Sequence, residues 1–126
     1  MNYMTMVCDI KKSHQLENRE AVQYQIIDML KEANGRFSDS IVAPFIITLG
    51  DEWQGLLKNR PNYSEILSFF HQKLGKIDFY CGIGVGEVTI NNFELTVNQL
   101  DGPSFHKARK AINLAKEQNY SLVLLH

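Results

Sequence analysis

Apolar residues along this chain form two kinds of pattern: short continuous runs, and longer stretches in which they recur every three or four positions. Continuous runs are typical of buried strands, and the wider spacing is typical of amphipathic helices. The runs at Tyr3–Ile10, Ile77–Val88 and Ser121–Leu125 therefore predict three strands. The segment Pro44–Lys58 holds two further apolar runs around a Gly-Asp pair, which predicts a hairpin of two more strands.

Three stretches carry the helical spacing. The first predicted helix spans 17–37, and Asn18 is a candidate capping residue near its start. The second helix runs from Tyr63 to a stop at Gly75. The third begins within 101–104, where a proline suits the first turn.

The predicted order is strand, helix, strand, strand, helix, strand, helix, strand. Its first six elements are those of the split βαβ, or ferredoxin-like, arrangement. We therefore expect an α+β fold with a βαββαβ core and an additional C-terminal helix and strand. A chain of 126 residues suits one such domain, spanning 1–126.

The predicted hairpin carries two carboxylates at its tip. Gly50 is the first residue of a two-residue loop, where the positive φ of a type II′ turn favours glycine. Asp51 and Glu52 follow it directly. Such a pair can be an ordinary solvated turn, or it can provide oxygen ligands for a divalent cation.

A third acid, Asp9, lies at the end of the first predicted strand. In the ferredoxin-like sheet this strand lies antiparallel beside the return strand of the hairpin, so its end meets the hairpin tip. Asp9 and Asp51 are then expected to converge, with Glu52 adjacent. Carboxylates at such a short distance repel one another unless a cation joins them or one of them holds a proton. Such oxygen ligands suit Mg²⁺ or Mn²⁺, with substrate phosphates completing the shell.

Gly82, Gly84 and Gly86 recur at every second position of the predicted strand 77–88, so they share one face of the sheet. Glycine weakens a strand, and three glycines on one face indicate very close packing by another backbone, a helix or a ligand. A phosphate-binding loop is excluded, because such loops connect a strand to a helix rather than lying inside a strand.

The third predicted helix has an apolar side and a basic side. The basic side consists of His106, Lys107, Arg109 and Lys110. Such a cluster can be a solvated helix face. Alternatively, Lys107 or Arg109 contacts a phosphate, in this chain or across a dimer.

Composition and charge narrow the class of protein. The net charge of −1 gives no electrostatic footprint for nucleic acid or an anionic membrane. No apolar run approaches the length of a transmembrane helix, and residues 1–10 lack the features of a signal peptide. Cys8 and Cys81 fall inside predicted strands without metal-like spacing, which indicates reduced core thiols in a cytoplasmic protein. The apolar stretch 122–126 leaves open that this is the first domain of a longer polypeptide.

Four segments occur in the order and at the spacing found in SatD family proteins: VCDIKKS, TLGDEWQGLL, CGIGVGEV and DGPSFHKAR. The chain thus resembles that family over almost its whole length. SatD-like proteins in turn resemble class III nucleotidyl cyclases and GGDEF diguanylate cyclases. The resemblance implies a palm-type βαββαβ core and a site for two metal ions and a nucleoside triphosphate.

By this resemblance, Asp9 and Asp51 would be the metal ligands. The Ile10 carbonyl would assist them, and Glu52 loosely matches the second acid of the GGDEF turn. The remaining residues implied to lie against the nucleotide are Lys11, Lys12, Ser13 and Gly50. Class III cyclases also carry an Asn and an Arg on a late helix. Arg109 is available for the Arg, but this sequence places no Asn one turn before it.

Three functions are consistent with these features. The first is a regulatory domain that binds a nucleotide with Mg²⁺ or Mn²⁺, without strong catalysis, and controls an attached DNA-binding region. The second is a Mg²⁺- or Mn²⁺-dependent nucleotidyl cyclase or transferase that acts on a nucleoside triphosphate as a homodimer. The third is a protein-interaction module without a ligand. No membrane contact is expected, and nucleic acid would bind only through a region absent from this chain.

The three functions differ in their expected effect on stability. If Asp9 and Asp51 serve a cation, neutralising either one relieves repulsion when no metal is added. If they cap local backbone groups in an interaction module, removing either one lowers stability.

Overall fold

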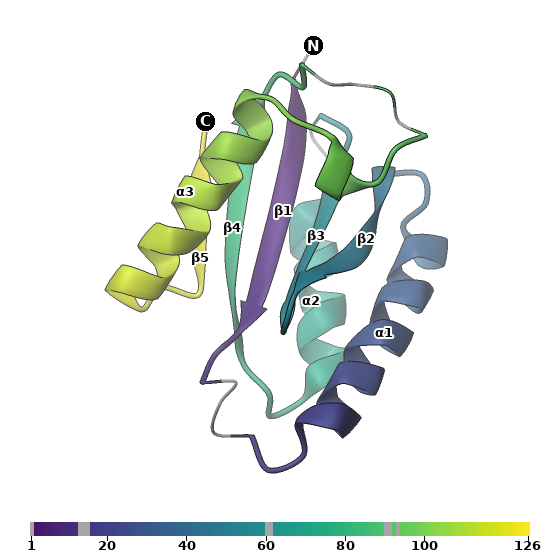
Figure 1. The fold of residues 1–126 in the computed structure, drawn as a ribbon, viewed down its shortest axis with the longest axis vertical. Helices are drawn as coiled ribbons and strands as arrows, with labels where there is room; N and C mark the ends of the chain where they lie inside the picture. The colour runs from purple at the N-terminus through teal and green to yellow at the C-terminus, as the bar shows by residue number, and fades with distance from the viewer. Residues whose placement is uncertain (1, 13–15, 60–61, 90–91, 93) are drawn as a thin grey trace.

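The structure is a computed structural model that describes residues 2–12, 16–59, 62–89, 92 and 94–126. Within these residues, five strands form one sheet and three α-helices pack on it (Figure 1). The strands are β1 (Tyr3–Ile10), β2 (Ile41–Leu49), β3 (Glu52–Leu57), β4 (Phe79–Gly86) and β5 (Leu122–Leu125). The helices are α1 (Arg19–Arg36), α2 (Tyr63–Leu74) and α3 (Pro103–Gln118), with a short 3₁₀ helix, η2 (Val97–Gln99), before α3.

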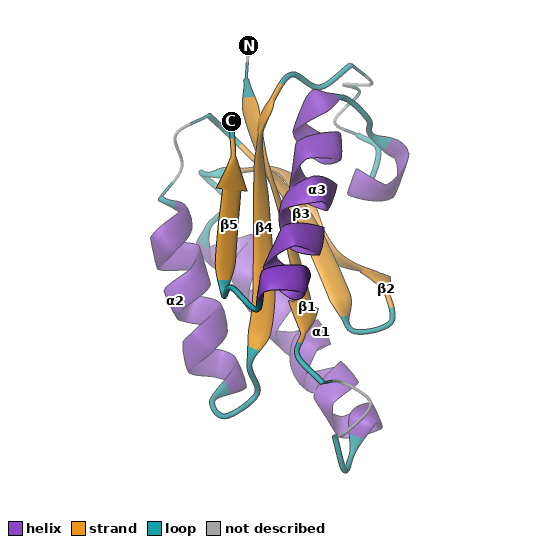
Figure 2. Ribbon diagram, turned by 90° about the vertical axis from the view of Figure 1, so that its left-hand side faces the viewer, coloured by secondary structure: helices purple, strands orange, loops and turns teal. Residues whose placement is uncertain are grey.

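The strand order in the sheet is β2-β3-β1-β4-β5. β1 lies at the centre and pairs antiparallel with β3 and β4, while β5 joins β4 in parallel. The first six elements therefore form the ferredoxin-like core, and α3 with β5 forms the C-terminal addition (Figure 2). The predicted fold class and element order are both confirmed.

One face of the sheet is covered by α1 and α2 (Figures 1 and 2). The largest apolar cluster of the described residues lies between these helices and the sheet, and it is rich in aromatic rings. The rings of Trp53 and Phe70 are 5.7 Å apart in an edge-to-face arrangement, and those of Trp53 and Phe79 are 5.4 Å apart. Burial of these large side chains supplies much of the free energy that holds the domain together.

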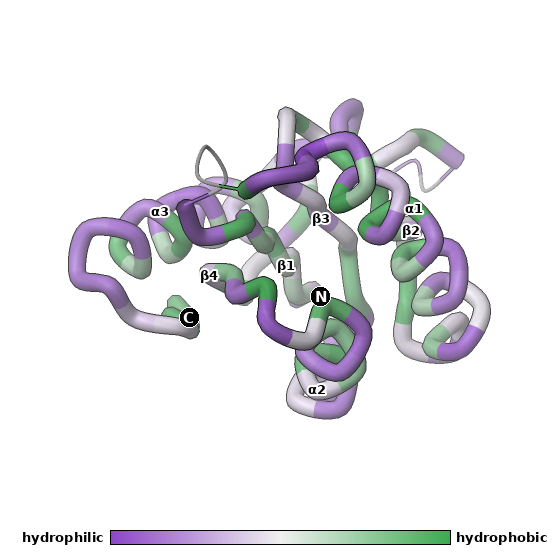
Figure 3. Tube along the Cα trace, turned by 90° about the horizontal axis from the view of Figure 1, so that it is seen from below, coloured by the Kyte–Doolittle hydropathy of each residue, from purple (hydrophilic) through white to green (hydrophobic). Residues whose placement is uncertain are grey.

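On the other face of the sheet, α3 packs against β4, β5 and β1, while η2 contacts β2 and β3. Hydrophobic and hydrophilic positions alternate along α3 (Figure 3). A Cβ on Gly82 would come within 2.4 Å of the Ile112 backbone nitrogen, and one on Gly84 within 2.3 Å of the Ala108 backbone nitrogen. No side chain fits at that separation. The close approach predicted from the glycines is therefore that of a helix, and not of a ligand.

The hairpin turn and the start of α1 follow local rules. Gly50 has a φ of 54°, whereas Asp51 has no positive φ, which is the pattern of a type II′ turn. The Asn18 side chain accepts a hydrogen bond from the Ala21 N–H, so Asn18 is the N-cap and α1 begins at Arg19, two residues later than predicted.

β2 begins at Ile41, three residues before the start of the predicted hairpin at Pro44. Ile41 and Ala43 pair with Leu57 and Leu56 of β3, with shifts in register between them. The prediction was wrong for these residues because irregular pairing at a sheet edge leaves no period-two apolar pattern in the sequence.

Cys8 and Cys81 are cross-strand partners in the β1–β4 pair, and both are buried free thiols. Burial raises the pKa of the Cys8 thiol, which keeps it protonated and unreactive. No helix in the described part of the chain is long and apolar enough to cross a membrane.

Candidate functional site

The tip of the β2–β3 hairpin lies beside the end of β1 (Figure 1). Asp9 is the register partner of Glu52, and the Ile10 backbone N–H donates to the Asp51 carbonyl at 3.3 Å. The topology therefore brings the three acids to one edge of the sheet.

The three carboxylates nevertheless point to different neighbours. Asp9 and Glu52 lie on adjacent strands and contact α3, whereas Asp51, in the turn, contacts the start of α1. Among the residues that the structure describes, no group of three or more His, Cys, Asp and Glu side chains is placed to hold a metal ion. At this edge, Asp9 and Glu52 therefore form a pair on the α3 side, and Asp51 lies alone on the α1 side.

Glu52 is enclosed on the α3 side, with a side chain that is 7% exposed. Arg109 donates to both of its oxygens, Nη1 to Oε1 at 2.7 Å and Nη2 to Oε2 at 2.9 Å, and Thr48 Oγ1 donates to Oε2 at 2.7 Å. Burial by itself would raise the pKa of Glu52, but the hydrogen bonds from Arg109 and Thr48 outweigh it and lower the pKa. The hydrogen bonds that Arg109 donates to Glu52 raise the pKa of Arg109. Glu52 is therefore an anion at neutral pH.

The other two acids also have cationic partners. Lys116, in the last turn of α3, forms an ion pair with Asp9, and Arg19, the first residue of α1, contacts Asp51 at 3.0 Å. These cations offset the repulsion expected among the acids. Neutralising Asp9 or Asp51 would leave a cation without its partner, so the expected relief of repulsion no longer separates the three functions.

The chemistry of the Asp9 and Glu52 donors fits Mg²⁺ or Mn²⁺. The two carboxylates come from adjacent strands, and each already attracts a positive group. Mg²⁺ often uses one or two protein carboxylates and completes its shell with water and substrate phosphates. Two carboxylates are therefore sufficient for a cation that arrives with a phosphate-bearing ligand.

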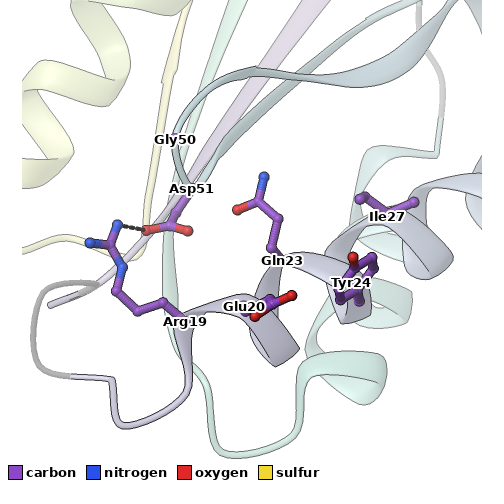
Figure 4. A pocket seen from close by; sticks show the side chains of 7 residues that line it. All are labelled: Arg19, Glu20, Gln23, Tyr24, Ile27, Gly50 and Asp51. Carbon is purple, nitrogen blue, oxygen red and sulfur yellow. Dashed lines mark hydrogen bonds and ion pairs between the residues drawn. The ribbon is translucent and has the colours of Figure 1, made fainter.

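A hollow of ≈ 440 Å³ lies between the start of α1 and the hairpin tip (Figure 4). Gln23 projects from α1 toward the hairpin, between Asp51 and Ile27, and Tyr24 is 60% exposed. The volume is in the range of small-molecule sites, roughly 300–1,000 Å³. The hollow is lined by Arg19, Glu20, Gln23, Tyr24, Ile27, Gly50 and Asp51.

Lys11 and Lys12, which follow β1 and were expected to lie against the nucleotide, do not line this hollow. Lys11 Nζ is 3.3 Å from Asp78 Oδ2 and 4.8 Å from the centre of the Tyr80 ring. Lys12 has a φ of 51°, in the left-handed region, and lines a second hollow of ≈ 470 Å³ together with Lys11. Ser13 lies outside the described residues.

The basic residues of α3 have different partners. Arg109 reaches Glu52, but Lys107 Nζ donates to the Val85 carbonyl of β4 at 3.1 Å. Arg109 therefore lies beside the acids, whereas Lys107 lies against β4.

Four residues at this edge are not predicted from the sequence: Arg19, Gln23, Tyr24 and Lys116. Arg19 did carry a signal, because a cation in the first turn of a helix is unfavourable for the helix dipole unless an anion is near. Lys116 carried none, since a lysine in the last turn of a helix is ordinary. Gln23 and Tyr24 become candidates only once α1 is placed beside the hairpin.

A family model described as the SatD family matches residues 3–123. Comparison with curated proteins finds no match. The chain is similar in structure to the GGDEF domain of PA1120 (YfiN or TpbB) from Pseudomonas aeruginosa, with a TM-score of 0.60 and 16% identity over 99% of this chain and 83% of that one. It is also similar to a bacterial light-regulated adenylyl cyclase, with a TM-score of 0.61 and 16% identity over 98% and 74% of the two chains. The guanylate cyclase domain of RhGC from Catenaria anguillulae, solved in complex with GTP, gives 0.56 and 14% over 89% and 72%.

At these identities the likeness shows the fold alone. The chain has the palm-type fold of GGDEF and nucleotidyl cyclase domains. Ligand and reaction depend on the site itself.

Proposed function

Because the chain belongs to the SatD family and has a cyclase-like palm fold, we propose that it binds a nucleotide together with Mg²⁺ or Mn²⁺. The proposed role is regulatory, with binding acting as a signal rather than leading to strong catalysis. One observation carries the proposal: the hairpin tip has a hollow lined by Asp51 on its α1 side and the adjacent acids Asp9 and Glu52 on its α3 side.

The hollow offers groups suited to a nucleotide. The exposed ring of Tyr24 provides a face on which a base can stack. The Gln23 amide, which projects into the space beneath the hairpin, provides both a donor and an acceptor for a base edge. Arg19 places a guanidinium on the same wall, and guanidinium groups bind phosphates well. The hollow therefore suits a planar base and an anionic group together.

In this proposal, Asp9 and Glu52 hold the divalent cation, with Asp51 and the Ile10 carbonyl at the same edge. The bound cation would neutralise phosphate charge. Lys11 and Lys12, which line the second hollow at this edge, would add positive charge for the phosphates, and Gly50 lets the hairpin tip turn tightly beside them. Mg²⁺ and Mn²⁺ are both hard cations that accept this oxygen donor set.

A sensory role is favoured because the nearby cations already have partners. Arg109 contacts Glu52, Lys116 contacts Asp9, Arg19 contacts Asp51 and Lys107 contacts a β4 carbonyl. Strong catalysis of phosphoryl or nucleotidyl transfer requires donors aimed in advance at the charge that develops in the transition state. Cations engaged in this way are better suited to binding than to rapid turnover.

Nucleotidyl cyclase or transferase activity by a homodimer is the second candidate. Asp9 and Glu52 on adjacent strands favour it, since paired carboxylates hold the metals of two-metal nucleotidyl transfer. A second copy of the chain would then supply the missing cationic group over the phosphates. Arg109 and Lys107 are the candidates for that contact. The ligand-free interaction module is the third candidate.

The test is calorimetric titration of ATP and GTP, each with and without Mn²⁺, into the wild type and into Tyr24→Ala and Glu52→Gln. Asp39→Asn is the matched control, because Asp39 is an exposed acid in the connection between α1 and β2. We expect Mn²⁺-dependent binding in the wild type and in Asp39→Asn, with at least a tenfold loss in the other two variants. Chromatography of the same samples reports any pyrophosphate or cyclic product.

Product formation would select the cyclase over the sensor. Absence of nucleotide binding by the folded wild type would contradict both and would leave the interaction module. Equal binding by all four proteins would place the nucleotide elsewhere and contradict the assigned site.

A further inference from the structure

We infer that Arg109 and Lys116 form an internal latch on the α3 side of the sheet, which a divalent cation must displace to bind. The latch is defined as the two ion pairs Arg109–Glu52 and Lys116–Asp9. This inference rests on the proposed function, because it concerns the same carboxylates. It adds that α3 itself sets how tightly the domain takes up the metal.

The two pairs match in geometry. Arg109 and Lys116 lie on one helix, about two turns apart. Asp9 and Glu52 are direct partners on β1 and β3, so their side chains lie side by side. The two cations therefore reach the acid pair from positions about two turns apart along α3, and each acid receives its own cation.

The oxygens of Glu52 are almost fully used by the latch. Arg109 Nη1 contacts Oε1, while Oε2 accepts from both Arg109 Nη2 and Thr48 Oγ1. A carboxylate has about four lone-pair positions, so three donors leave little room for a further ligand. A divalent cation at Glu52 would also repel the adjacent guanidinium. Metal and latch therefore exclude each other at this carboxylate.

A partner is needed because Glu52 is buried. An ionised carboxylate that is 7% exposed is costly unless a positive group satisfies it. Arg109 provides that group, and a metal ion could replace it. Glu52 is therefore paired either with Arg109 or with the metal ion, and in neither state is it left without a positive partner.

The latch can open without movement of α3. The side chains of Arg109 and Lys116 are 47% and 39% exposed, so both can turn into solvent. The helix itself is fixed, because its backbone packs directly on Gly82 and Gly84. Release is therefore expected to be a change of side-chain rotamers on a stationary helix.

The test measures Mn²⁺ affinity from the electron paramagnetic resonance signal of free Mn²⁺ in the wild type, Arg109→Gln, Lys116→Gln and Lys110→Gln. Lys110→Gln is the matched control, since it removes the same charge from an exposed position of α3. We expect Arg109→Gln and Lys116→Gln to bind Mn²⁺ about tenfold more tightly than the wild type and Lys110→Gln. Without added metal, both should unfold at a lower Tm, and Mn²⁺ should restore more of that loss than it adds to the control.

Affinities in Arg109→Gln and Lys116→Gln that equal or fall below that of Lys110→Gln would overturn the latch. If Arg109→Gln does not fold, Lys116→Gln decides, because Asp9 is more exposed than Glu52 and tolerates the loss better. Mn²⁺-dependent nucleotide binding in the wild type with no gain in the variants rejects the latch alone. Failure of every protein to bind Mn²⁺, with or without ATP or GTP, rejects the proposed function and the latch together.

Discussion

The two faces of the sheet are held by different interactions. Against α1 and α2, large apolar and aromatic side chains such as Trp53 and Phe70 fill the space. Against α3, glycines bring the helix backbone onto β4, and hydrogen bonds and ion pairs lie beside them. On the first face, burial of apolar surface contributes most of the stability. On the second face, the close placement of α3 against β4 matters most.

This difference indicates that the two faces have different roles. The α1–α2 face stabilises the domain through apolar burial, which depends little on exact direction. The α3 face keeps a helix at a fixed distance so that Arg109 and Lys116 meet the acids of β1 and β3. Substitutions on the two faces should therefore fail in different ways.

The largest effect is expected from Phe70→Ala on the aromatic face. Phe70 is fully buried between α2 and the sheet and contacts the rings of Phe45 and Trp53. Removal of its ring should lower the free energy of unfolding by about 3–5 kcal/mol, because the cavity can collapse only in part. Urea unfolding followed by Trp53 fluorescence measures this loss. The control Leu49→Ala, at a site 76% exposed, should change stability by less than about 0.5 kcal/mol.

The next largest effect is expected from Gly84→Ala on the α3 face. The new methyl group would lie 2.3 Å from the backbone of Ser104 and Ala108, so the helix must shift. We expect a loss of about 1–3 kcal/mol through overpacking, although the substitution adds apolar surface. Gly35→Ala in α1 is the matched control, since its Cβ would meet open space, and it should stabilise by about 1 kcal/mol. Equal effects at the two glycines would contradict the close packing of α3.

A smaller effect is expected at the buried hydroxyl pair on the same face. Thr5 Oγ1 and Ser104 Oγ are 2.7 Å apart, and Ser104 Oγ also donates to the Gly84 carbonyl at 3.0 Å. Ser104→Ala should cost about 1–2 kcal/mol, because it leaves Thr5 and the carbonyl with fewer partners. A double-mutant cycle with Thr5→Val measures the coupling, and additive losses would show that the two hydroxyls act independently.

The smallest effect is a pH dependence at Glu52. Its folded pKa is lowered, so its ion pair stabilises the fold above the unfolded pKa, near 4.3, and that stabilisation is lost as pH falls through the folded pKa. Between about pH 6 and pH 3, the wild type should lose about 1 kcal/mol more stability than Glu52→Gln. Glu117→Gln, an exposed change on α3, should keep the wild-type pH dependence. A wild type and Glu52→Gln with the same acid profile would contradict the lowered pKa.

The sequence predicts the fold well because its signals are local and periodic. Apolar spacing in α1 and α2 and the Gly-Asp turn at residues 50 and 51 identify the elements, and the ferredoxin-like connection then places Asp9 beside the hairpin. The start of β2 is the exception, since its pairing with β3 is irregular.

The site is predicted less completely because side-chain direction depends on tertiary contacts. Glu52 lies in a strand and follows its alternation, whereas Asp51 lies in the turn and contacts α1 instead. The counter-cations Arg19 and Lys116 come from helix ends whose approach no short motif encodes. Lys107 and Arg109 looked equivalent in sequence, and only packing on β4 separates them.

The most direct measurement is a crystal structure of the domain with Mn²⁺ and GTP or ATP, in which anomalous scattering locates the metal. We predict a Mn²⁺ peak between the carboxylates of Asp9 and Glu52, with Arg109 and Lys116 turned away and the base beside Tyr24. A peak elsewhere, or a nucleotide bound while both ion pairs remain intact, would contradict the assigned site.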